Sequence, residues 1–229
     1  MYNLKMLYIV ATPIGNIKDI TLRAIETLKN VDLILCEDTR ETKKLLNYYG
    51  IKKPLLSYYR EIEKKRVDKV IKLLKEGKDI ALVCDRGTPG ISDPAYILVR
   101  EVYKNNIKVT PIPGPSSLTA ALSICGFFLN RVYFLGFLPK KENEKRKIFE
   151  KFKDMEETIL FFESVHRIEK TIYLLNEIIP EKEICICREL TKVFEEVIRG
   201  KVKDVFEIFK KEKKKGEFVI IIKGEKNGF

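Results

Sequence analysis

Short apolar runs alternate with amphipathic stretches along the first half of the chain. Four runs are rich in aliphatic and β-branched residues, as buried strands tend to be, and they lie at residues 6–11, 31–36, 80–84 and 107–112. Apolar residues recur at helical spacing after Asp19, a candidate N-cap region, and again from Val67 to Gly77, a plausible C-cap. This alternating order of strands and helices predicts a mostly parallel sheet.

The alternation resumes in the second half. A helix is expected over residues 168–179, and strands are expected at residues 132–138, 158–162, 183–187 and 217–223. The halves are joined by PIPGPSS (residues 111–117), whose prolines and glycine predict a rigid, irregular connection. We therefore expect an α/β protein with two α/β domains, residues 1–117 and 118–229.

Composition and charge narrow the class of protein. The 229 residues are 45% hydrophobic, which is enough to bury a sizeable core. A formal net charge of +11 favours a polyanionic partner, although surfaces rich in Lys and Glu also occur in heat-tolerant proteins. Two lysine-rich stretches, residues 139–153 and 210–215, are more typical of solvated surface than of phosphate contact. With no signal-peptide or membrane-spanning pattern, we expect a cytoplasmic protein that does not bind membranes.

The five cysteines give no metal-binding pattern. Cys185 and Cys187 form a C-x-C that places both thiols on one face of a strand, but no second pair completes a zinc set. The other three lie in apolar runs. We expect buried free thiols and no metal.

Two Gly/Pro loops each follow an apolar run, TPIGN (residues 12–16) and DRGTPGISDP (residues 85–94). Loops at the carboxyl ends of parallel strands line the ligand crevice of an α/β sheet. Neither loop has the glycine pattern that binds a dinucleotide pyrophosphate or a nucleoside triphosphate. Their prolines also remove backbone donors, so they suit a small ligand without phosphate.

These loops belong to a longer set of motifs that resembles a known family. Together the motifs closely resemble the ribosomal RNA methyltransferases of the tetrapyrrole-methylase-like group, which use S-adenosylmethionine, over roughly residues 7–224. The strings in order are TPIGN, CEDTR (residues 36–40), DRGTPGISDP, PIPGPSS, FFESVHR (residues 161–167), RELTK (residues 188–192) and KGEFVIIIKG (residues 215–224).

The resemblance implies a two-domain tetrapyrrole methylase fold with S-adenosylmethionine in the cleft between the domains. It further implies methylation of a cytidine ribose 2′-oxygen in the decoding region of 16S rRNA, as naked RNA or within the 30S subunit, by a homodimer. The residues it assigns to cofactor binding are Pro13, Gly15, Asp85, Gly87, Thr88, Pro89, Ser116, Ser117, Phe162 and Leu190.

Polar residues of the same motifs are the candidates for acceptor chemistry. Glu37, Asp38 and Arg40 are expected to bind substrate, with Arg40 a candidate for a substrate phosphate. The catalytic candidates are Glu163, His166, Arg167, Glu189 and Lys192. His166 is the only histidine, and a lone histidine is more often structural than catalytic.

Three other functions stay open at this stage. A methyltransferase of the same fold acting on a small porphyrinoid precursor is the first. An NAD-dependent oxidoreductase is the second, because Glu37 follows the first loop at about the 20-residue spacing of a ribose-binding acid. The third is an RNA-binding module without catalysis.

Overall fold

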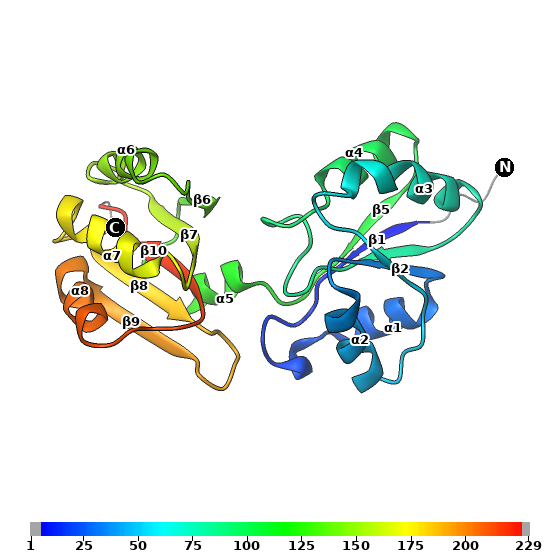
Figure 1. Ribbon diagram of the computed structural model, residues 1–229, viewed down its shortest axis with the longest axis horizontal. Coiled ribbons are helices and arrows are strands. Elements are labelled where there is room, and N and C mark those ends of the chain that lie inside the picture. Colours follow the sequence, from blue (N-terminus) through cyan, green and yellow to red (C-terminus); the bar gives the residue numbers. More distant parts are fainter. Residues whose placement is uncertain (1–5, 226–229) are drawn as a thin grey trace. The chain divides into compact units, whose positions relative to one another are not determined.

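The computed structural model describes residues 6–225 and divides into two compact units (Figure 1). The boundary falls between Ser116 and Ser117. Each unit has a five-stranded sheet and a hydrophobic core of its own.

The first unit is a parallel sheet covered by helices on both faces. Its strands are in the order β3-β2-β4-β1-β5, with α1 and α2 on one face and α3 and α4 on the other (Figure 1). This confirms the predicted parallel sheet. The elements are β1 (Leu7–Val10), the 3-10 helix η1 (Ile17–Asp19), α1 (Leu22–Asn30), β2 (Leu33–Cys36), α2 (Thr39–Tyr48), β3 (Leu55–Ser57), α3 (Glu63–Lys75), β4 (Ile80–Leu82), α4 (Tyr96–Lys104) and β5 (Val109–Ile112).

The order of the strands creates a crevice at one end of the sheet, where the strands finish; we call this end the carboxyl edge of the sheet. β1 and β4 are neighbours, yet the chain leaves β1 toward α1 on one face and leaves β4 toward α4 on the other. Connections that diverge in this way leave a crevice at the carboxyl ends of the two strands, where open α/β sheets bind ligands. Both Gly/Pro loops start at this edge.

Local hydrogen bonds explain where the helices begin and end. α1 is capped by Thr21, whose Oγ1 accepts from the Ala24 N–H at 3.1 Å, whereas Asp19 lies in η1. The prediction that α1 is capped near Asp19 was therefore wrong, because Asp19 belongs to the short helix η1 and the cap of α1 is Thr21. Gly77 follows α3 with a φ of +85°, a conformation that glycine adopts without strain.

The start of α4 is held by a residue of α3. The buried Glu63 carboxylate accepts from the Ile97 N–H and from the Tyr58 hydroxyl, each at 3.2 Å. Ala95, the N-cap residue of α4, offers no side-chain acceptor. Glu63 therefore fixes the point at which the loop after β4 re-enters a helix.

The second unit has a mixed sheet in the order β6-β7-β10-β8-β9. Only β6 and β7 are parallel, and the other neighbouring pairs are antiparallel. The elements are α5 (Ser117–Ile124), β6 (Val132–Phe137), α6 (Glu142–Phe152), β7 (Thr158–Ser164), α7 (Ile168–Ile178), β8 (Glu183–Arg188), β9 (Glu196–Lys201), α8 (Val202–Lys211) and β10 (Glu217–Ile222).

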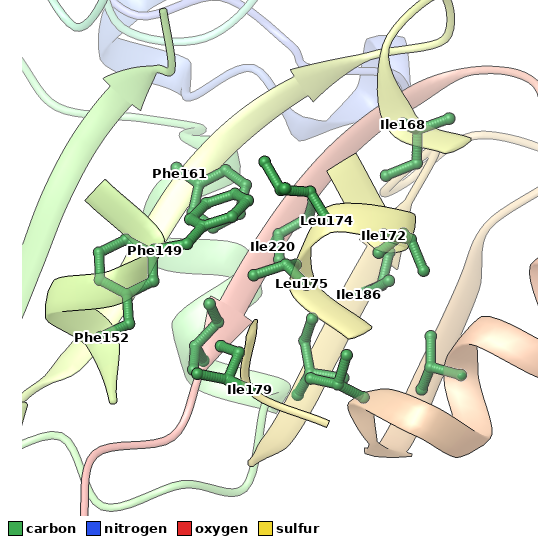
Figure 2. Close-up of a cluster of buried hydrophobic side chains, with 14 of the residues drawn as sticks. Phe149, Phe152, Phe161, Ile168, Ile172, Leu174, Leu175, Ile179, Ile186 and Ile220 are labelled. Carbon is green, nitrogen blue, oxygen red and sulfur yellow. The ribbon is translucent and has the colours of Figure 1, made fainter. Parts of the chain in front are cut away.

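Helices α6, α7 and α8 cover one face of this sheet. The apolar side chains between these helices and the sheet form the hydrophobic core of the unit. Figure 2 shows Phe149 and Phe161 packed beside each other, with Leu175 of α7 near Ile220 of β10. Cys185 and Cys187 alternate with core residues on β8, and their sulfur atoms lie 3.9 Å apart. All five cysteines are buried and free, as predicted.

Lys214, in the second of the two charged stretches, departs clearly from the solvated surface that we expected. Lys214 is buried, and its Nζ lies 2.8 Å from a Glu196 oxygen and 2.7 Å from a Glu212 oxygen. Lys210, by contrast, is half exposed and pairs with Glu207 on α8. Lys214 is therefore part of the structure of the unit and unavailable to an outside anion.

Candidate functional site

Hydrogen bonds lock together the loops that follow β1 and β4. The Thr12 N–H donates to the Gly87 carbonyl at 2.8 Å, and the Gly87 N–H donates to the Thr12 carbonyl at 3.0 Å. The Thr12 hydroxyl also donates to the Cys84 carbonyl at 3.0 Å. Pro13 and Gly15 are thereby held at the same edge of the sheet as Gly87, Thr88 and Pro89.

The loop after β5 joins the same edge. The Thr88 hydroxyl donates to the Pro115 carbonyl at 3.2 Å, which holds the connection leading to Ser116 and Ser117. Gly87 has a φ of +83°, and a Cβ atom added to it would lie 3.4 Å from Ile14 Cγ2. Only glycine fits this position without strain.

A third loop, after β2, is tied to the loop after β4. The Asp38 N–H donates to Asp85 Oδ1 at 3.0 Å. Asp38 also caps α2, accepting from the Arg40 N–H at 2.7 Å, and its Oδ2 lies 2.7 Å from Arg40 Nη2. These hydrogen bonds lower the pKa of Asp38 to about 2. Arg40 is exposed, but its guanidinium is already paired with Asp38.

Acidic side chains gather at the ends of β2 and β4. Burial raises the pKa of Glu37, Asp85 and Asp93, and repulsion from neighbouring carboxylates adds to the shift. Two arginines act in the opposite direction, Arg60 from the loop after β3 on Glu37 and Asp93, and Arg86 on Asp85. This edge of the sheet therefore has an excess of negative charge that favours a cationic ligand.

Asp93 and Arg60 were not among the predicted site residues. Asp93 stands inside the DRGTPGISDP motif, in a loop that was expected to line the ligand crevice, but it was not selected as a site residue. The Cys84 thiol donates a hydrogen bond to it that lowers its pKa against the effect of burial. Arg60 follows a strand too short to be predicted, so no sequence signal placed it at this edge.

We expect Asp93→Asn to stabilise the ligand-free protein at pH 7 by roughly 0.5 kcal/mol, because it removes a partly buried charge that is also repelled by Asp85. The gain is modest because Asp93 is only partly buried and solvent screens its charge. The folded-state pKa of Asp93 is raised, so its ionisation opposes folding; this cost grows as pH rises from the unfolded-state pKa to the higher folded-state pKa and is constant above it. At about pH 3 aspartate is protonated in both states and the gain should vanish. Urea unfolding at both pH values measures this, and equal stability of the two proteins at pH 7 would contradict it.

In the second unit, Glu163 is the centre of a buried network at the end of β7. Its Oε1 lies 2.7 Å from Arg167 Nε and accepts from the Ser164 N–H at 2.9 Å. Its Oε2 lies 3.1 Å from Lys145 Nζ and accepts from the Thr171 hydroxyl at 2.6 Å. These four contacts occupy both carboxylate oxygens, so the geometry favours a role in positioning Arg167 and Lys145 over direct contact with a substrate.

Lys145 was also missed. It lies in the charged stretch 139–153 that we expected to be solvated, yet its side chain is 6% exposed. Lys145 is recognised as a member of this buried network only from its contacts with Glu163 and Thr171, which are distant from it in the sequence. His166, in contrast, is exposed, and its side chain makes no hydrogen bond within residues 6–225.

Glu189 and Lys192 form a second polar group, at the end of β8. Lys192 Nζ donates to Glu189 Oε1 and to Glu217 Oε2, each at 2.8 Å. Glu189 and Thr191 have φ values of +49° and +63°, so the RELTK turn is strained. A Cβ atom at Gly216 would lie 2.6 Å from Glu189 Cγ, which explains the glycine there.

The sheet register brings these two groups to one edge. β7 and β8 both run antiparallel to β10, so their carboxyl ends lie together at the start of β10. Ser164 is opposite Glu217, and the Glu189 N–H donates to the Glu217 carbonyl at 3.0 Å. The predicted catalytic residues Glu163, His166, Arg167, Glu189 and Lys192 therefore share one edge of this sheet.

The two remaining candidates of this unit are apolar. Phe162 packs edge-on against Phe134 and Phe137, with ring centroids 5.0 Å and 5.6 Å away. Leu190 is buried within the RELTK turn. Their assignment to the cofactor stays a prediction.

Comparisons with known proteins agree on the fold. The family model for Tetrapyrrole (Corrin/Porphyrin) Methylases matches residues 6–205. Among solved structures, diphthine synthase superposes with a TM-score of 0.73 at 14% identity, covering 96% of this chain and 90% of that chain. The cobalamin biosynthetic enzyme cobalt precorrin-4 methyltransferase superposes with a TM-score of 0.69 at 18% identity, covering 95% and 94%.

Curated relatives are considerably more similar. A Thermotoga maritima protein is 48% identical over 219 residues, which is 96% of this chain and 98% of the relative. A Leptospira biflexa protein is 50% identical over 193 residues, covering 84% of this chain and 80% of the relative. Both are named ribosomal RNA small subunit methyltransferase I. The chain therefore belongs to the tetrapyrrole methylase family, within the group whose curated members bear that name.

Proposed function

We propose that this protein transfers a methyl group from S-adenosylmethionine to the ribose 2′-oxygen of a cytidine in the decoding region of 16S rRNA. The proposal rests on one observation. In the first unit, hydrogen bonds join the loops that follow β1, β2, β4 and β5 at the carboxyl ends of these strands. The names of the relatives support an rRNA substrate and methyl transfer.

The residues at this edge fit S-adenosylmethionine. The donor has a positively charged sulfonium and an ammonium group but no phosphate, so it suits acidic loops that lack phosphate-binding glycine patterns. When bound, it supplies a methyl group on an electrophilic sulfur. We propose that Asp85, Glu37 and Asp93 attract the positive charge, while Gly87 and Pro89 let the backbone approach the ligand closely.

The other assignments are part of the same proposal. Pro13, Gly15, Thr88, Ser116, Ser117, Phe162 and Leu190 are proposed to contact the donor, and Asp38 and Arg40 the RNA. Methyl transfer from a sulfonium needs alignment above all, and alignment is worth about 7–11 kcal/mol. We propose that His166, Glu189 and Lys192 orient the acceptor hydroxyl, and that Glu163 acts by holding Arg167.

The oxidoreductase alternative rests on Glu37 alone. Glu37 does follow β2, as a ribose-binding acid would, but no G-x-G-x-x-G follows β1. Calorimetry with S-adenosylmethionine and with NAD separates the two functions. Binding of NAD without binding of S-adenosylmethionine would overturn the proposal.

We expect the affinity for 30S subunits to fall steeply as salt rises, because phosphate contacts release counterions, while the affinity for S-adenosylmethionine changes much less. The measurement is the slope of log Kd against log salt for each ligand. A flat response for 30S subunits would contradict a polyanionic substrate. Charge reversal at Lys210, Lys211 and Lys213 tests whether this stretch takes part, and the buried Lys214 is left unchanged because it pairs with Glu196 and Glu212.

The last part of the proposal concerns the cellular location and the oligomeric state of the protein. No helix among the described residues is long and apolar enough to cross a membrane. We propose that the protein acts in the cytoplasm as a homodimer on rRNA within the 30S subunit.

A further inference from the structure

The end of β7 holds more positive charge than its buried carboxylate neutralises. Lys145 and Arg167 both pair with Glu163, whose side chain is 0% exposed. Thr171, the other side chain in this network, is uncharged. Two cations against one anion leave a net charge of +1, and an uncompensated charge near a protein interior favours an anion from outside.

Arg167 is the member of the network that can reach such an anion. Its side chain is 21% exposed, its Nε pairs with Glu163 and its Nη1 donates to the Leu138 carbonyl at 3.0 Å. Within residues 6–225, Nη2 has no hydrogen-bonding partner. The guanidinium is therefore held in one orientation, and its Nη2 is available to donate to a ligand, as in many phosphate-binding arginines.

Two further cationic or titratable side chains lie in the adjoining loops. β6 and β7 are parallel, so the loops that follow them start at the same edge, and the contact between Arg167 and Leu138 joins them. Lys140 in one loop and His166 in the other are exposed and unpaired within the described part of the chain. Both can add donors to an anion held by Arg167.

Acidic residues limit the size of this positive region. Glu142 and Glu144 lie in the first turn of α6, Glu169 lies in the first turn of α7, and all three are exposed. Glu144 also lies 3.5 Å from Lys141, which reduces the positive charge of that lysine. The region therefore fits a single phosphate better than a long stretch of nucleic acid backbone.

An exposed aromatic ring lies beside the arginine. Phe137 is 55% exposed, and the Arg167 guanidinium carbon lies 6.0 Å from the centre of its ring. Proteins that bind single-stranded RNA commonly stack bases on such rings. A phosphate-binding arginine next to an open aromatic ring matches the two parts of one nucleotide.

We propose that the loops after β6 and β7 bind one phosphate of the acceptor RNA through Arg167, Lys140 and His166, with a neighbouring base stacked on Phe137. This inference rests on the proposed function, because it assigns the anion to the RNA substrate. The carboxylate of S-adenosylmethionine is the competing source of the anion. Its involvement would be visible as a change in donor affinity.

The test measures binding of 30S subunits over a range of salt concentrations for Lys140→Ala and Arg167→Lys. Lys140→Ala removes a charge and should lower the slope of log Kd against log salt by about 1. Arg167→Lys keeps the charge but should weaken binding roughly tenfold, because lysine cannot reproduce the fixed fork. Lys151→Ala, an exposed lysine in the last turn of α6, is the matched control and should match the wild type.

Calorimetry with S-adenosylmethionine completes the test. Unchanged donor affinity in both variants, together with weaker 30S binding, supports the inference. Weaker donor binding with unchanged 30S binding overturns it, as does wild-type 30S binding in Lys140→Ala and Arg167→Lys. Lys140 is exposed and outside the buried network, so its variant stays informative even if Arg167→Lys unfolds. Failure of the proposed function is detected separately, as absence of methyl transfer by the wild-type protein.

Discussion

Replacing Gly87 by valine is expected to weaken S-adenosylmethionine binding by at least about tenfold in a protein that still folds. Gly87 has a φ of +83°, where a β-branched residue is strained, and its Cβ position lies 3.4 Å from Ile14 Cγ2 in the neighbouring loop. Valine must therefore shift the loop or intrude on the ligand. Calorimetry gives the affinity, and thermal melting shows that the protein is folded.

Gly77→Val is the matched control for backbone strain. Gly77 has a nearly identical φ of +85° after α3, and a Cβ atom there meets nothing within 4 Å. Both variants should lose similar stability, about 1–2 kcal/mol, from the left-handed conformation. Only Gly87→Val should lose donor affinity. Wild-type affinity in a folded Gly87→Val protein would remove this loop from the donor site.

Replacing Glu163 by glutamine is expected to lower the free energy of unfolding by about 3–5 kcal/mol, because it leaves buried cations without a counter-charge. Lys145 and Arg167 would then face each other's charge at the end of β7 with only neutral partners. Urea unfolding monitored by circular dichroism measures the loss. The same substitution should release Arg167 and so weaken 30S binding.

Lys145→Met is the informative comparison. Removing this lysine leaves Glu163 paired with Arg167 in a neutral cluster, so the cost should be smaller than that of Glu163→Gln. An exposed pair such as Lys210 with Glu207 should contribute less than about 1 kcal/mol. A Glu163→Gln protein as stable as the wild type would mean that the network does not hold this edge of the sheet together.

Local pattern was sufficient to predict eight of the ten strands in the described residues, and the helices α1, α3 and α7. The strands β6, β7, β8 and β10 and the helix α7 carry strong apolar periodicity, and all five were predicted within a few residues. β3 was missed because it has three residues. β9 was missed because it contributes only Ile198 to the buried core and is otherwise polar or partly exposed. The direction of the strands in the second sheet depends on long-range pairing that periodicity does not encode.

Only those parts of the candidate site that belong to the sequence motifs could be predicted. The loops after β1, β2, β4 and β5 follow their strands as predicted, and hydrogen bonds join them. Lys145 and Arg60 were missed because their roles arise from tertiary contact. Lys145 reaches Glu163 across 18 residues and Thr171 across 26, and nothing in its own charged neighbourhood distinguishes it from a solvated lysine.

The proposed reaction is methyl transfer to a ribose of 16S rRNA. Its most direct test incubates the protein with 30S subunits that lack this modification and with isotopically labelled S-adenosylmethionine, followed by mass spectrometric mapping of the rRNA. We expect label in a single 2′-O-methylcytidine of the decoding region. The proposed reaction would be contradicted by label on a base, by label outside 16S rRNA, or by unlabelled rRNA in the presence of a protein that binds the donor.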